Sequence, residues 1–129
     1  MIRRRGSGPV AAWVFAAVFG GSGALHLLRP AVFDGIVPPV LPGSARFWTT
    51  SSGVAELALA AGFAVPAARR VAGPVAAGFL LAVWPANGQM AVDAWRVRSR
   101  DRAAAVRCAV ALVRLPLQVP LVRAAWRVR

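Results

Sequence analysis

Long stretches without charged residues are the feature that most constrains this chain. Residues 9–28, PVAAWVFAAVFGGSGALHLL, include only one residue, the histidine, that can carry a charge. As an α-helix rising 1.5 Å per residue, such a stretch spans about 30 Å, the thickness of the hydrocarbon core of a bilayer. Because a backbone in that core must satisfy its own hydrogen bonds, the stretch predicts a transmembrane helix.

Three further stretches are long and mostly apolar. Residues 47–68 are interrupted by one charge, Glu56, and residues 71–92 contain none. Residues 103–126 form the fourth stretch and include VRLPLQVP, which holds Arg114, Gln118 and two prolines. We therefore expect an all-α protein, a four-helix transmembrane bundle that forms a single membrane domain over residues 1–129. A cleavable signal peptide is the competing interpretation of the first stretch, but the three later spans favour an uncleaved helix.

The connection between the first two spans, RPAVFDGIVPPVLPG, is rich in proline. Pro38, Pro39 and Pro42 fall within five residues, and a residue that precedes proline avoids the helical conformation. Several neighbouring residues are apolar. The connection is therefore predicted to be an ordered cap or a short re-entrant segment between helices 1 and 2.

The composition favours a lipid environment over nucleic acid. Hydrophobic residues make up 58% of the chain, above the range of about 45–50% that soluble domains show. The net charge is +12, but most of the arginines flank the apolar stretches and do not interleave with aromatic residues on a polar surface. We expect the lipid bilayer to be a partner and expect no nucleic acid to bind.

The arginines also suggest an orientation in the membrane. With four spans, the N-terminus, the turn at 69–70 and the C-terminus share one side, which carries eight arginines against six on the other. Cytoplasmic loops carry the excess of positive charge. Both termini are therefore predicted to lie in the cytoplasm, with the chain a multi-pass protein of the bacterial cytoplasmic membrane.

Two charged residues are predicted to meet inside the bundle. Glu56 lies about nine residues into the second span and Arg114 about eleven into the fourth, and these spans run in the same direction. Their depths therefore agree to within roughly 3 Å. An intramembrane ion pair of this kind either fixes helix register or forms a ligand or proton site, and both interpretations stay open.

Other polar residues extend this candidate site. His26 lies near the end of the first span, where it is either an interfacial residue or a quinone contact or proton donor. Asn87 and Gln89 follow Pro85, and Gln118 lies between Pro116 and Pro120. Such side chains can satisfy carbonyl groups that proline leaves without a donor. The chain has one cysteine, Cys108, and no cluster of cysteine and histidine, so no metal site is predicted.

Four ordered motifs, GALHLLRPAVFDGIVPPVLP, SSGVAEL, VWPANGQMA and VRLPLQVPL, together resemble the DoxX-like family of bacterial integral membrane proteins. The resemblance covers the chain from about Gly23 to Trp126, with Leu27 where an aromatic residue often follows the histidine and Gly88 after the PAN segment. It implies a four-helix bundle in the cytoplasmic membrane. The family takes its name from a subunit of a quinone-linked thiosulfate oxidoreductase, and most members have no established activity.

Two classes of function follow. The first is a small accessory membrane subunit, associated with a soluble or membrane oxidoreductase partner, whose polar core binds a small amphipathic molecule such as a quinone. The second is a stand-alone enzyme or proton-coupled transporter that uses Glu56. The chain has no dithiol, haem ligand pair or dinucleotide loop for redox catalysis by itself. Four helices leave little room for alternating access, unless the chain forms a homo-oligomer.

Overall fold

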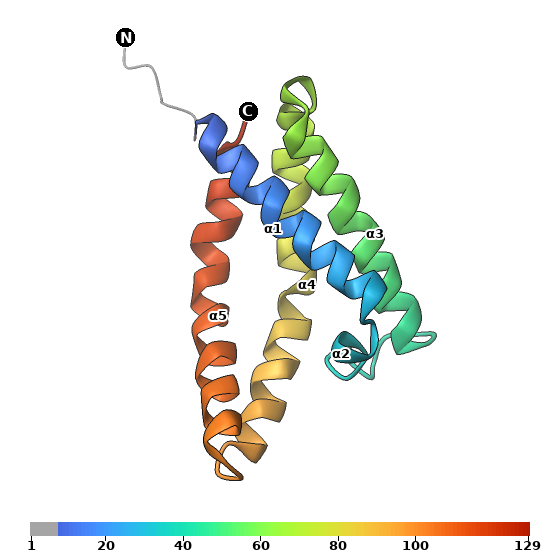
Figure 1. Ribbon diagram of the computed structural model, residues 1–129, viewed down its shortest axis with the longest axis vertical. Helices are drawn as coiled ribbons and strands as arrows, with labels where there is room; N and C mark the ends of the chain where they lie inside the picture. The colour runs from blue at the N-terminus through green and yellow to red at the C-terminus, as the bar shows by residue number, and fades with distance from the viewer. Residues whose placement is uncertain (1–7) are drawn as a thin grey trace.

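The computed structural model describes residues 8–129, and this part of the chain is helical with short connections (Figure 1). The elements, in chain order, are α1 (Pro9–Leu28), α2 (Ala31–Asp34), α3 (Ala45–Ala64), the 3-10 turn η1 (Pro66–Ala68), α4 (Arg69–Val97) and α5 (Arg102–Arg127). The all-α class is confirmed. The arginines at residues 3–5, which contribute to the predicted orientation, lie outside the described residues.

Local chemistry explains where the helices begin and end. Pro9 occupies the first turn of α1, where its missing N–H costs no helical hydrogen bond. The Ser44 hydroxyl accepts from the backbone N–H of Phe47 and caps α3, and Asp101 caps α5 through Ala104. The proline-rich connection contains the one-turn helix α2, so this connection is ordered, as predicted.

The prolines within the apolar stretches do not end the helices. Both α4 and α5 continue through two prolines each, Pro74 and Pro85 in α4, and Pro116 and Pro120 in α5. Each proline removes one backbone donor, but a long helix in apolar surroundings has no better conformation to adopt.

Within residues 8–129, three helices are long and apolar enough to cross a membrane, namely α1, α4 extended by η1, and α5. The helix α3 is not among these three. Its first half carries Thr49, Thr50, Ser51 and Ser52, and Glu56 follows, so it contains no stretch of 18 residues as apolar as those of the other three. The second of the four predicted spans is therefore the one that composition alone does not support.

The four long helices share a core toward one end of the molecule. Phe63 of α3 stacks on Phe15 and Phe19 of α1, with ring centroids 5.1 and 6.0 Å apart. Ala76 of α4 and Ala125 of α5 complete this buried cluster. Figure 1 shows that the helices come together at the end where α1 begins and α5 ends, and that the α1–α3 pair separates from the α4–α5 pair toward the other end. A four-helix bundle along the whole length is therefore not confirmed.

The main packing is pairwise: α1 runs antiparallel to α3, α4 packs on α5, and α3 contacts α4 less extensively. Outside these contacts the long helices expose apolar side chains. Examples are Val14 and Val18 of α1 and Val110, Val113 and Leu117 of α5. Faces of this kind suit contact with lipid.

Glycines bring α1 and α3 together. A Cβ atom on Gly23 would lie 2.8 Å from the Gly53 carbonyl oxygen, and a Cβ atom on Gly53 would lie 2.8 Å from the Cβ of His26. Gly53 thus allows a close helix approach, and α1 is the helix that approaches. Small residues fill this role in membrane helix pairs.

Gly23→Ala is expected to destabilise the α1–α3 pair, because the added methyl group would collide with backbone atoms of α3. We expect a loss of about 1–3 kcal/mol in the free energy of unfolding. Gly21→Ala is the matched control on the same helix, because its Cβ would meet no atom within 4 Å. Thermal unfolding in detergent should separate the two variants, and equal midpoints would contradict the close approach.

Candidate functional site

Glu56, the single glutamate of the chain, is buried near the middle of α3 and is only 8% exposed. The Ser22 hydroxyl of α1 donates a hydrogen bond to Glu56 Oε1 at 3.1 Å. His26, four residues later on α1, places its Nδ1 atom 3.0 Å from Glu56 Oε2. Two polar side chains from one face of α1 therefore contact the two oxygens of the same carboxyl group.

The imidazole of His26 is oriented by its own helix. Its Nδ1 atom lies 2.8 Å from the Ser22 carbonyl oxygen. Because a carbonyl oxygen can only accept, this contact requires the hydrogen on Nδ1. The N–H then points toward Ser22, and Glu56 Oε2 is buried without a hydrogen-bond donor among residues 8–129. The contact between Nδ1 and Oε2 is therefore electrostatic, and one carboxyl oxygen keeps an unused acceptor position.

The segment between α1 and α3 covers the imidazole. Phe33 of α2 stacks on His26, with ring centroids 3.7 Å apart and planes inclined by 14°. Asp34 Oδ2 accepts two hydrogen bonds from Arg46 at the start of α3, from Nε at 3.0 Å and from Nη2 at 2.8 Å. The hydrogen bond from Arg46 holds the pKa of Asp34 below its ordinary value. The tie between the cap and α3 is therefore ionic at neutral pH.

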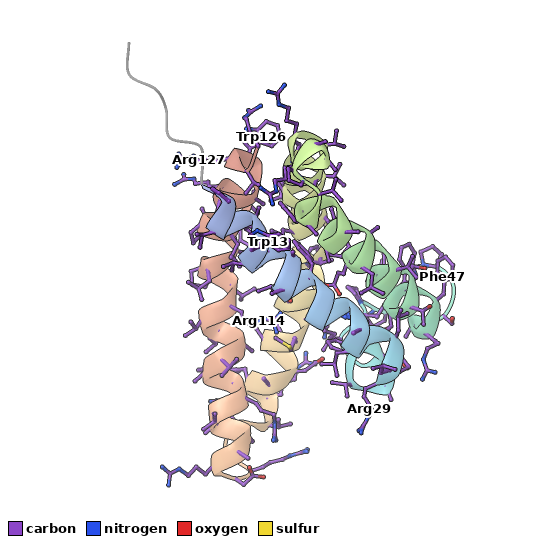
Figure 2. The ribbon with its side chains drawn as sticks, turned by 45° about the horizontal axis from the view of Figure 1, so that its top comes forward. Trp13, Arg29, Phe47, Arg114, Trp126 and Arg127 are labelled. Carbon is purple, nitrogen blue, oxygen red and sulfur yellow. The ribbon has the colours of Figure 1, made fainter. Side chains whose placement is uncertain are left out.

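The predicted ion pair between Glu56 and Arg114 is not formed. Arg114 lies about midway along α5 (Figure 2), is exposed, and makes no hydrogen bond or ion pair within the described part of the chain. The physical reason is packing, because α3 lies against α1 and α4 and makes little or no contact with α5.

Within residues 8–129, no hydrogen bond joins any of the other predicted site residues to Glu56. Gln118 is buried and donates through Nε2 to the Leu80 carbonyl oxygen, which ties α5 to α4 five residues before Pro85. Asn87 is buried in α4. Gln89 donates to Asp93 Oδ1 at 3.1 Å, one turn further along the same helix. Gln118 is therefore an interhelical tie between α4 and α5.

Three residues make clear contacts in the structure but are absent from the site predicted from the sequence. Ser22 and Phe33 contact Glu56 and His26 directly. The buried Arg69 donates from Nε to the Phe63 carbonyl oxygen at 2.8 Å, near the end of α3. The spacing of Ser22 and His26 was a usable signal, since residues four apart share one face of a helix. No comparable signal marks Phe33 or Arg69.

The fold and this carboxyl–imidazole pair define a small all-α protein with helices long enough to cross a membrane and one buried acidic group. The chain belongs to the family described as a domain of unknown function, DUF8561, whose model matches residues 4–129. No curated protein and no solved structure matches it. Residues 8–129 contain no group of three or more histidine, cysteine or acidic side chains that could hold a metal ion.

A double-mutant cycle tests which residue is the partner of Glu56. Unfolding in mild detergent would be measured for Glu56→Gln, His26→Gln and the double variant, and for the same cycle with Arg114→Gln. We expect a coupling energy of about 0.5–3 kcal/mol between Glu56 and His26, because residues in contact do not act additively. Arg114 is the control, with near-additive effects. A larger coupling to Arg114 than to His26 would contradict the observed pairing.

Proposed function

We propose that the chain is a four-pass integral membrane protein of the bacterial cytoplasmic membrane, related in architecture to the DoxX-like proteins. In this proposal it is an accessory subunit whose Ser22–His26–Glu56 site binds a small amphipathic molecule that can donate a hydrogen bond, such as the reduced form of a quinone. The observation that carries the proposal is the buried Glu56 Oε2 atom, which has no hydrogen-bond donor among the described residues.

The course of the chain supports four crossings. The helix α1 begins at the end that carries the termini, and α4 begins at that same end (Figure 1). If α1, α4 and α5 each cross the bilayer, α3 must bring the chain back across it. Ser22, Gly23 and His26 of α1 cover the polar face of α3 around Glu56 and Gly53. Pairing with α1 thus offsets the low hydropathy of α3.

The distribution of charge supports the proposed orientation. Among residues 8–129, the end of the molecule where α1 begins and α5 ends has no acidic residue, and its arginines are Arg69, Arg70, Arg123, Arg127 and Arg129. At the opposite end arginines are mixed with Asp34, Asp93 and Asp101. Unbalanced positive charge next to membrane spans is typical of the cytoplasmic side. Both termini would then lie in the cytoplasm.

The chemistry of the site suits a ligand that donates a hydrogen bond. A buried carboxylate oxygen without a donor is costly, and a ligand hydroxyl would remove that cost. The Oε2 atom is buried, so a ligand hydroxyl would displace neighbouring side chains to reach it. The stacked rings of His26 and Phe33 add an aromatic surface at the same place. A quinol combines the required hydroxyl group with an aromatic ring.

The accessory role follows from the limited set of reactive groups. The chain contains one histidine and one cysteine, so it cannot supply a dithiol or a bis-histidine haem site by itself. Electron transfer would then belong to a partner oxidoreductase, with this chain supplying the binding site in the membrane.

A proton-coupled transporter or stand-alone enzyme is the second candidate. The observation that favours it is the 3.0 Å distance between His26 Nδ1 and Glu56 Oε2, which places two groups that can exchange protons side by side. Proton movement into vesicles that contain only this chain, lost in Glu56→Gln, would support that candidate.

Binding of a short-chain benzoquinol to the chain in lipid nanodiscs tests the ligand proposal. Glu56→Met keeps the side-chain volume and removes the acceptor, so affinity should fall by roughly tenfold to a hundredfold, the effect of losing a hydrogen bond to a charged group. Arg114→Gln is the matched control and should bind like the unaltered chain. Equal affinity in Glu56→Met would contradict the proposal.

A further inference from the structure

A second candidate binding site lies far along the chain from Glu56, in a groove between α4 and α5. The groove has a volume of about 380 Å³. From α4 it is lined by Pro74, Ala77 and Gly78, and from α5 by Arg123, Trp126 and Arg127. One part of its wall is therefore apolar and another part carries two guanidinium groups.

Small residues of α4 create the groove. A Cβ atom on Gly78 would meet no atom within 4 Å, so α4 leaves open space at this position. Near one end of the groove the two helices are in close contact, since a Cβ on Gly73 would lie 2.6 Å from the Ala125 carbonyl oxygen. The groove is thus open beside a fixed contact between α4 and α5.

The two arginines of the groove have no acidic partner in the protein. The chain has four acidic residues, all within the described part. Asp34 pairs with Arg46, Glu56 lies beside His26, Asp93 lies beside Arg96, and Asp101 caps the opposite end of α5. Arg123 and Arg127 form no ion pair within residues 8–129. No acidic side chain of the protein is therefore available to neutralise these two charges.

The surroundings of these arginines indicate which kind of anion fits. Trp126 lies beside Arg127 at the end of the molecule that carries both termini (Figure 2) and is 56% exposed. Tryptophan and arginine next to apolar helix faces are typical of the headgroup level of a bilayer. The apolar wall continues from Arg123 and Val122 to Leu81 of α4. A ligand that spans both parts must join an anionic group to a hydrocarbon chain.

We propose that this groove binds an anionic phospholipid, with the phosphate between Arg123 and Arg127 and one acyl chain along Ala77 and Gly78. Arg123 and Arg127 are four residues apart on one helix face, so both can reach the same phosphate. The proposal depends on the chain lying in a bilayer. It does not depend on the ligand of Glu56, so either site can fail without the other.

Titration with phosphatidylglycerol tests the site. The chain is held in nanodiscs of phosphatidylcholine, and bound phosphatidylglycerol is counted by native mass spectrometry. The double variant Arg123→Gln/Arg127→Gln should lower the affinity by roughly twenty- to thirtyfold, since each arginine near an anionic surface contributes about fivefold. The matched control Arg100→Gln/Arg102→Gln removes two arginines at the other end of α5 and should change the affinity less than twofold. An equal loss in both double variants would overturn the proposal in favour of general electrostatic attraction.

The apolar half of the site has its own test. Gly78→Leu fills the groove without touching either arginine and should lower phosphatidylglycerol affinity about tenfold, whereas Gly88→Leu, at an equally open glycine of α4, should not. Unchanged affinity in Gly78→Leu would show that no acyl chain occupies the groove. Inorganic phosphate at millimolar concentration should not displace the lipid. Displacement would show that free phosphate is the ligand, and would overturn the proposal.

Discussion

The placement of one carboxyl group, Glu56, in an apolar helix pair is the constraint on which the rest of the structure depends. A carboxyl group removed from water is costly unless nearby groups stabilise it. The stabilising groups come from a single face of α1, where Ser22 and His26 are one turn apart and contact one oxygen each. Those contacts require α1 to lie very close to α3. Gly23 and Gly53 allow that distance, so the polar site and the closest helix packing are one feature.

The same contacts explain why the protein can carry a polar helix at all. Within residues 8–129, α3 is the long helix that lacks a stretch apolar enough for a membrane span, and part of its polar first half lies where α1 and the α2 cap cover it. The cap is tied to α3 by Asp34 and Arg46 and packs on the imidazole through Phe33. The pair α4–α5 needs no such arrangement. Its tie is the amide of Gln118, and its open groove faces outward with two arginines that have no acidic partner.

Much of the fold could be predicted from the sequence, because charge is so strongly localised along it. The uncharged stretch 9–28 corresponds to α1 as observed, and 103–126 differs from α5 by one residue at each end. The proline-rich cap was also predictable. The splaying of the helices was not, because hydropathy measures how apolar a stretch is and says nothing about which helices touch. The family match adds no activity to this picture.

The candidate site was predicted only in part, and the error has a simple geometric cause. Counting residues gives the depth of a side chain along its helix, and on depth alone Glu56 and Arg114 are compatible partners. Counting residues does not give the direction in which each side chain points, and it does not give the order of the helices around the core. His26 was recognised as a polar candidate but not as the partner of Glu56. The four-residue spacing of Ser22 and His26, with Gly23 between them, was the signal that these residues face another helix.

Solid-state nuclear magnetic resonance in bilayers tests the central claim most directly, because the chain has one histidine and one glutamate. With ¹⁵N-labelled histidine and ¹³C-labelled glutamate, the dipolar coupling between the imidazole nitrogen and the carboxyl carbon reports on this single pair. The structure, with Nδ1 at 3.0 Å from Oε2, predicts a strong coupling. A sample with ¹⁵N-labelled arginine should give none at the glutamate carboxyl carbon. Strong coupling to arginine and none to histidine would contradict the account.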